Sequence, residues 1–245
     1  LILGIEIQCR IGNVLCKPPA TSAVGFSMQG LLGTFGAAVA LGKVLGLDEK
    51  QMAMNIGHAG NQSSGVRQAQ SSMGSHYTPG HSARCGVMAA LIAKRDFTCC
   101  ENMIEGPKGY GVSFASNPNY DAALDGLGTD FELSQLAYKP YPSGFVIHPV
   151  IDACLDIAKD RRLDPATIER IEIVVHPLTI KLTDIVSPRD RGEALVSFQH
   201  WTAISLMQGA AGIAQVTDEV VRDPAVAALR AKVKAIPSDT MGKEA

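Results

Sequence analysis

The chain has 245 residues, of which 46% are hydrophobic and 19% charged, and its formal net charge is −2 with an isoelectric point near 6.3. This length is enough for one or two domains with a buried core, and the lack of a basic excess argues against nucleic-acid binding. The longest apolar-rich run, residues 30–42, is too short to cross a bilayer and contains four glycines, so we expect no membrane segment.

The cysteines indicate a reduced, cytoplasmic protein. There are six of them, no two are spaced as CxxC, and Cys99 and Cys100 are adjacent. This arrangement suits neither a zinc site nor a disulfide framework. The sequence begins without a methionine, in the middle of a helical pattern, so we expect it to be a piece of a longer protein.

Residues 1 to about 130 are rich in alanine and glycine and have helical periodicity. The run 31–45 is apolar almost all round, which predicts a helix inside a helix cluster. Small residues in this run would let neighbouring backbones approach closely. The first helix of the chain is expected to bury one apolar face, which consists of Leu1, Ile5, Cys9 and Ile11.

Several local signals place the next helices. Asp48 followed by Gln51 resembles a capping box that opens a helix. The polar segment 60–75 follows, and loops of this length are often functional. Pro79 is predicted to begin another helix, which runs to about Ala93.

The residue composition and the hydrophobic periodicity change from about Phe131. Segments 131–137 and 168–176 contain alternating β-branched residues and are predicted to be strands. The pairs Asp164–Pro165 and Asp223–Pro224 are typical of an N-cap followed by the first helical residue. Helices and strands therefore alternate in this half, which favours an α/β arrangement beside an all-helical one.

A stiff loop joins the two halves and gathers ionisable groups. Lys139, Tyr141 and His148 lie within ten residues of one another, around Pro140 and Pro142. The prolines oppose helix formation until about residue 145, where an amphipathic helical pattern begins. The domains are accordingly predicted as 1–137, all-helical, and 138–245, α/β.

Six short sequence motifs, or phrases, occur in order over about 120 residues and resemble those of the MmgE/PrpD family. Enzymes of this family dehydrate, decarboxylate or epimerise small carboxylates. A further phrase at 197–200 extends the resemblance. The six phrases are residues 33–38, 45–51, 57–65, 80–91, 105–110 and 139–148.

The resemblance implies an α+β protein with a large all-helical domain followed by a smaller α/β lid domain. It also implies a homodimer, no metal, no other cofactor, and a site in the cleft between the two domains. About the first third of the family's chain would be absent here, so a second polypeptide is a conceivable partner for this one. The expected small-molecule partner is a di- or tricarboxylate.

By the same resemblance, Lys139 matches the family's inter-domain lysine and would bind a carboxylate or stabilise developing charge. His148 is a candidate catalytic residue, although a structural histidine is an equal alternative. His200 stands where related sequences often have a tyrosine, and a histidine there would be a better acid or base near neutral pH. Tyr141 is either a substrate-binding hydrogen-bond donor or a packing aromatic.

The sequence also departs from the family pattern. Ser27 replaces what resembles a catalytic histidine, and Ser75 and Thr78 stand where a lysine and a histidine are expected. A serine is no base at neutral pH without an activating partner. His76 could supply a shifted imidazole, and Arg67 could bind a carboxylate through two parallel hydrogen bonds. We therefore include Ser27, Ser75, His76 and Arg67 as candidate substrate-binding residues.

The function expected from these residues is a lyase of the dehydratase type that removes a proton next to a carboxylate. An epimerase or isomerase of a dicarboxylate such as iminodisuccinate is one alternative, because it needs two opposed proton carriers and no acid for a leaving group. A non-catalytic or partner-dependent carboxylate-binding protein is the other. The catalytic candidates are Lys139, His148 and His200.

Overall fold

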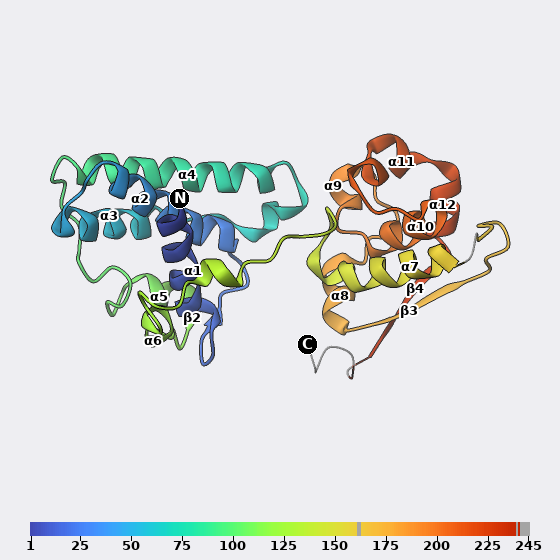
Figure 1. Ribbon diagram of the computed structural model, residues 1–245, viewed down its shortest axis with the longest axis horizontal. Helices are drawn as coiled ribbons and strands as arrows, with labels where there is room; N and C mark the ends of the chain where they lie inside the picture. The colour runs from blue at the N-terminus through green and yellow to red at the C-terminus, as the bar shows by residue number, and fades with distance from the viewer. Residues whose placement is uncertain (161–162, 239, 241–245) are drawn as a thin grey trace. The chain divides into compact units, whose positions relative to one another are not determined.

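The computed structural model describes residues 1–160, 163–238 and 240. The chain divides into two compact units, Leu1–Leu136 and Ala137–Ala245. Each unit has a hydrophobic core of its own. The first unit is built from helices and the second combines helices with a parallel strand pair (Figure 1). The expected α+β class is therefore confirmed.

In unit 1, long helices pack side by side, with α4 running along α2 (Figure 1). Short strands β1 and β2 pair antiparallel beside them. The elements of this unit are α1 Ile2–Cys16, β1 Thr21–Ser22, α2 Met28–Val44, α3 Glu49–Gln62, η1 Arg67–Ser71, α4 Gly74–Ala93, α5 Tyr110–Phe114, β2 Ala115–Ser116, α6 Asp121–Leu124 and η2 Glu132–Gln135, where η marks a 3₁₀ helix.

Glycines allow α2 and α4 to pack closely, as the small residues of the 31–45 run predicted. A Cβ placed on Gly86 of α4 would lie 2.5 Å from the carbonyl oxygen of Thr34 in α2. The capping box that opens α3 is also confirmed, because the Asp48 carboxylate accepts from the backbone N–H of Gln51 at 2.8 Å. The sequence therefore correctly predicted the close packing of α2 and the start of α3.

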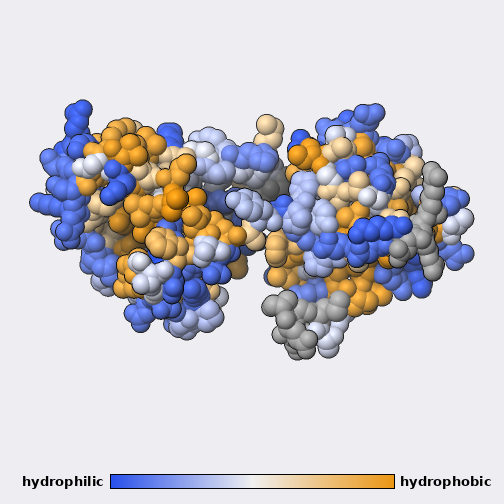
Figure 2. All heavy atoms as spheres, viewed as in Figure 1, coloured by the Kyte–Doolittle hydropathy of each residue, from blue (hydrophilic) through white to orange (hydrophobic). Residues whose placement is uncertain are grey.

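The buried face of α1 differs from the predicted one. Leu1 is 97% exposed, whereas the buried residues include Glu6 and Arg10, which form an ion pair of 2.6 Å. Arg10 also donates to backbone carbonyl groups of the segment 123–130. The prediction was right for Ile11, which is buried, and wrong for Leu1 and Ile5, which are exposed. Charged residues can be buried on this helix because they pair with each other and because backbone groups complete their hydrogen bonds. Orange apolar surface is visible over the start of α1 in Figure 2.

The predicted strand 131–137 is absent, and the 3₁₀ helix η2 occupies most of this segment. Side chains of α1 hold it. The Glu6 carboxylate accepts from the backbone N–H of Leu133 at 3.3 Å, and Asn13 donates to the Glu132 carboxylate at 2.7 Å. The first contact uses a backbone N–H that a strand would direct to a neighbouring strand, and the second holds the segment against α1.

Helix α4 begins at Gly74, five residues before the predicted start, and Pro79 lies inside it. The hydroxyl of Ser72 accepts from the backbone N–H of Gly74 at 3.2 Å, and the hydroxyl of Ser75 donates to the Ser72 carbonyl at 2.8 Å. These serines organise an extra turn before the proline, so the proline did not mark the first helical residue.

In unit 2, strand β3 pairs in parallel with β4, and Ile171 lies opposite Val233. The strand predicted at 168–176 is confirmed, and the segment of β4 carried no prediction. Helix α10 fills the centre of this unit and packs on α7, α12 and β4. The elements are η3 Phe145–Ile147, α7 His148–Asp160, β3 Ile171–Val175, α8 Pro177–Thr183, α9 Arg191–Ala194, α10 Phe198–Gln208, η4 Ile213–Val216, α11 Asp218–Arg222, α12 Pro224–Arg230 and β4 Val233–Pro237.

The two Asp–Pro pairs behave differently. Asp223 caps α12 through a hydrogen bond of 2.7 Å from the backbone N–H of Ala225, as predicted. Asp164 makes the same kind of contact with Ala166 at 2.9 Å but opens a turn and no helix. The same local signal is therefore extended into a helix only where the following residues pack, as Val226 does in the core.

Candidate functional site

The loop before α7 holds Lys139 against its own backbone. The Lys139 ammonium donates to the carbonyl oxygen of Ser143 at 3.1 Å, across the two prolines of the loop. Ser143 is 5% exposed, so this end of the loop is buried. Lys139 is an exposed residue, but this hydrogen bond bends its side chain back toward the buried end of the loop.

Tyr141 joins this loop to α7. Its hydroxyl donates to the Asp152 carboxylate at 2.5 Å, and this hydrogen bond, with burial and nearby carboxylates, raises the pKa of Tyr141 to about 12. The Tyr141 ring meets the His148 ring edge-on, with centroids 5.5 Å apart. Sequence reasoning missed Asp152, although it lies four residues after His148 and therefore on the same helix face.

His148 is 6% exposed and is the first residue of α7. Burial lowers its pKa, the positive charge of Lys139 adds to this effect, and interactions with backbone groups of Ser143 and Tyr141 oppose it. Its Nε2 atom is buried and has no hydrogen-bond partner among the described residues. The structure thus brings Lys139, Tyr141 and His148 together and leaves one imidazole nitrogen unsatisfied.

A hollow of about 320 Å³ lies beside this group. It is formed by residues around the start of α7 and by the start of α8. His176, which sequence reasoning also missed, faces it as the N-cap residue of α8. The His–Pro pair at 176–177 could have indicated an N-cap. The lining residues are Phe145, Val146, His148, Pro149, Asp152, His176, Leu178 and Thr179.

His200 lies apart from this group, in α10 within the core of unit 2. It has no exposed surface. Its Nδ1 faces the Arg230 guanidinium at 3.4 Å, and its Nε2 is 2.9 Å from the carbonyl oxygen of Gln215. Arginine only donates, so Nδ1 accepts and Nε2 carries the proton. Burial, together with the charge of Arg230, lowers the pKa of His200.

Ser27 and Arg67 lie on neighbouring segments of unit 1. The backbone N–H of Ser27 donates to Gly65 at 2.9 Å, and that of Arg67 donates to Gly25 at 2.9 Å. This short antiparallel pairing connects the segment before α2 with the segment before α4. The structure therefore brings these two candidates together within the helical unit.

Ser75 and Thr78 use their hydroxyl groups locally. Ser75 donates to the Ser72 carbonyl at 2.8 Å, and Thr78 donates to the Gly74 carbonyl at 3.1 Å. His76 is exposed on the first turn of α4. Among the residues that the structure describes, neither hydroxyl makes a hydrogen bond to a side chain that could activate it as a nucleophile or base.

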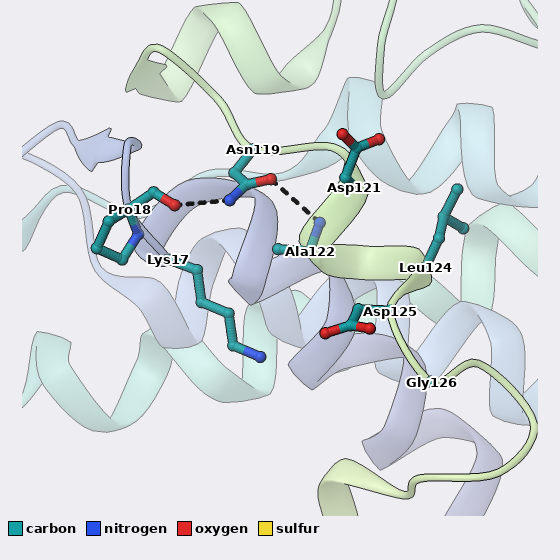
Figure 3. Close-up of a pocket in the computed structure, with 8 residues that line it drawn as sticks. All are labelled: Lys17, Pro18, Asn119, Asp121, Ala122, Leu124, Asp125 and Gly126. Carbon is teal, nitrogen blue, oxygen red and sulfur yellow. Dashed lines mark hydrogen bonds between the residues drawn. The ribbon is translucent and has the colours of Figure 1, made fainter.

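A wider hollow, of about 680 Å³, lies at the end of α1 in unit 1 (Figure 3). The Asn119 side chain closes one side, since it donates to the Pro18 carbonyl at 2.7 Å and accepts from the backbone N–H of Ala122 at 3.1 Å. Lys17 and Asp125 also line it. It contains none of the residues predicted to bind substrate, so its size does not make it the candidate site.

The described residues contain no cluster of three His, Cys, Asp or Glu side chains that could bind a metal ion. In that part of the chain, every helix is also too short or too polar to span a bilayer.

The sequence matches models of the MmgE/PrpD N-terminal domain over residues 1–123 and of the MmgE/PrpD C-terminal domain over residues 141–245. Together with the α+β fold, these matches define a protein with both domain types of one family. The chain belongs to the MmgE/PrpD family, which confirms the resemblance found in the sequence. It is 27% identical over 243 residues to a cis-aconitate decarboxylase of Mus musculus, across 95% of this chain and 48% of that relative. The chain thus spans about half the length of the curated relative it matches.

Proposed function

We propose that this chain contributes to a lyase that binds a small di- or tricarboxylate and removes a proton next to a carboxylate. The observation that carries the proposal is the buried His148 imidazole, whose Nε2 has no partner among the described residues, beside Lys139. A base of this kind must be uncharged at working pH, and the lowered pKa of His148 meets that requirement. Family membership and the similarity to a decarboxylase support the same class of chemistry.

The proposed roles follow from the geometry. His148 accepts the proton as the C–H bond breaks, and the bonding electrons pass into the adjacent carboxylate as an enolate-like charge. Lys139 stabilises that charge and binds the carboxylate. Tyr141 positions the His148 ring through its edge-on contact. The electron pair then forms a C=C bond as a hydroxyl group on the neighbouring carbon takes up a proton and leaves as water, which completes a lyase reaction of the dehydratase type.

The candidates of unit 1 belong to the proposal as substrate-binding residues. Arg67 would bind a carboxylate, and Ser27, Ser75 and His76 would contribute hydrogen bonds. A catalytic role for His200 stays a prediction from the sequence, and its two occupied ring nitrogens favour a role in the core instead. A homodimer in the cytoplasm is also part of the proposal.

The hydroxyl groups of Ser75 and Thr78, which donate to nearby backbone carbonyls, support two other functions. An epimerase needs no acid for a leaving group and would tolerate their substitution for a lysine and a histidine. A carboxylate-binding protein without catalysis would tolerate it as well. Both alternatives keep Lys139 as the carboxylate ligand.

Proton exchange tests the proposal. The protein is incubated in deuterated water with 2-methylcitrate, citrate, cis-aconitate and iminodisuccinate, and deuterium at the α-carbon is measured by NMR. We expect incorporation with at least one compound and a loss of at least about tenfold in Lys139→Ala, because an ammonium group that stabilises developing charge contributes on this scale. Lys181→Ala, an exposed lysine of α8, is the matched control and should keep the wild-type rate.

Product analysis separates the three functions. Formation of an unsaturated or decarboxylated product supports the lyase, and exchange with inversion alone supports the epimerase. Absence of exchange with every compound would contradict catalysis and favour the binding protein.

A further inference from the structure

Two of the six cysteines, Cys99 and Cys100, are adjacent in the chain, and the proposed lyase uses neither. They follow α4, in the segment 97–100, which belongs to no helix or strand. Cys100 is exposed and Cys99 is half-buried. The pair is therefore a vicinal dithiol that solvent reaches, in a segment whose backbone no helical or strand ladder fixes.

The half-buried thiol lies against α3. A Cβ placed on Gly57 of α3 would be 2.9 Å from the Sγ atom of Cys99 and 2.8 Å from the carbonyl oxygen of Cys100. The backbone N–H of Cys99 donates to the thioether Sδ of Met54, also on α3, at 3.0 Å. The glycine leaves room for the Cys99 side chain. These contacts hold Cys99 against the helix, while Cys100 is exposed to solvent.

The cysteines outside this pair are less suited to react with an oxidant. The thiolate is the reactive form of cysteine, so a raised pKa slows the reaction at neutral pH. Burial raises the pKa of Cys9 and of Cys16, and it raises the pKa of Cys154 to about 11. Cys85 is only 6% exposed, so a reagent reaches it poorly. These four thiols should therefore react slowly.

Within the pair, the two thiols suit different steps of an oxidation. Cys100 is exposed to a small oxidant, whereas burial raises the pKa of Cys99. The Cys100 thiolate attacks one oxygen of hydrogen peroxide, so that an S–O bond forms, the O–O bond breaks, and hydroxide leaves and is protonated to water. The Cys99 thiol then attacks the sulfenic sulfur. The S–S bond forms, the S–O bond breaks, and the oxygen leaves as a second water.

A disulfide between adjacent residues is strained and therefore reversible. The peptide bond between the two cysteines is not cis, and a trans peptide holds neighbouring Cα atoms about 3.8 Å apart. Most disulfides join Cα atoms that are about 4.4–6.8 Å apart, and strain makes the bond easier to reduce. Closing the ring breaks no hydrogen bond of a helix or strand, because the segment 97–100 is in neither.

We infer that Cys99 and Cys100 form a redox modification site, in which a peroxide converts the vicinal dithiol into a disulfide and a thiol reductant reverses the change. Cys100 is the attacking thiol and Cys99 the resolving thiol. The site lies in unit 1 and includes none of the residues assigned to substrate, so it stands apart from the proposed lyase activity.

Phenylarsine oxide tests the pair without oxidation. Its arsenic bonds to both sulfurs of a vicinal dithiol, and its oxygen leaves as water with the two thiol protons. We expect one adduct per chain in the intact-mass spectrum, and its loss in Cys99→Ser and in Cys100→Ser. The control Cys16→Ser removes the other exposed thiol and should keep the adduct. An adduct that survives in both serine variants of the pair would refute the site.

Oxidation is tested with hydrogen peroxide, followed by alkylation of free thiols and digestion with trypsin. Trypsin cleaves after Arg95 and Lys108, and the peptide between these sites holds both cysteines and no other. We expect this peptide to lose two hydrogen atoms and to escape alkylation, and dithiothreitol to restore both free thiols. Met103 lies in the same peptide, and its sulfoxide, which adds an oxygen atom, is distinguished by mass. Two alkylated thiols beside an oxidised Met103 would overturn the inference.

Serine variants separate the two roles. In Cys99→Ser, the sulfenic acid at Cys100 meets no resolving thiol, so dimedone should trap it there. In Cys100→Ser, the half-buried Cys99 should give less dimedone adduct than Cys100 gives in the other variant. The reverse order would contradict the assigned roles. A disulfide between two molecules, seen as a dimer on a non-reducing gel of the oxidised wild type, would contradict the intramolecular ring.

Discussion

The two buried histidines of unit 2 differ in what surrounds their nitrogens. His200 has a partner at each nitrogen, Arg230 at one and Gln215 at the other. His148 has a buried Nε2 without a partner among the described residues. A satisfied imidazole stabilises the fold, whereas a buried imidazole nitrogen without a partner costs free energy. Burial alone therefore does not distinguish a structural histidine from a functional one.

Both histidines should make the protein less stable as the pH falls from 7.5 to 5.5. Burial lowers the pKa of each below the ordinary value of 6.5. Over this range the unfolded chain binds protons that the folded protein excludes, so the free energy of unfolding rises with pH. Urea denaturation at the two pH values measures the difference.

His200→Gln is the variant that tests the source of this dependence. Glutamine stays neutral, so the change in unfolding free energy between pH 7.5 and 5.5 should shrink. Exposed His76 shows no comparable burial, and His76→Gln should leave the dependence as in wild type. A dependence unchanged in His200→Gln would show that the core imidazole is not responsible.

At the scale of elements, close approach between helix backbones organises unit 1. Gly86 on α4 faces the backbone of α2, where a Cβ would lie 2.5 Å from the Thr34 carbonyl oxygen and 2.7 Å from the Ala38 nitrogen. Backbone atoms cannot move aside as a flexible side chain can. The distance between these helices therefore depends on glycine at this position.

Gly86→Ala should destabilise the protein by about 1–3 kcal/mol, the usual cost of overpacking a core. Gly80→Ala in the same helix is the matched control, since its Cβ would meet nothing within 4 Å. Alanine is the better helix former, so this control should be neutral or more stable by up to about 1 kcal/mol. Equal effects of the two changes in thermal denaturation would refute the packing argument.

At the scale of the whole molecule, the chain has two separate cores. The core of unit 1 includes Phe35 and Tyr110, and that of unit 2 includes Trp201 and Ile204. A unit with its own core is a separate cooperative unit of folding. The division of the chain thus has a thermodynamic consequence that can be measured.

Scanning calorimetry should resolve two unfolding transitions. Gly86→Ala should lower the midpoint of one, and His200→Gln should alter the other, because the two changes lie in different cores. A single transition that both variants shift by similar amounts would show that the cores unfold together.

The sequence by itself determined the α+β class, the family and the elements with strong local signals. The Asp48 capping box, the apolar helix α2 and strand β3 depend on neighbours along the chain, so sequence patterns predict them. The loop from Lys139 to His148 was also identified as a cluster of ionisable groups.

Only the tertiary structure decided the buried face of α1, the 3₁₀ helix at 132–135 and the partners of the histidines. Glu6 and Arg10 are buried because carbonyl groups more than 100 residues away accept from the guanidinium. Likewise, Arg230 donates to His200, and His148 and His176 line the same hollow although a strand separates their helices along the chain. Such contacts depend on long-range packing, which residue order along one element does not encode.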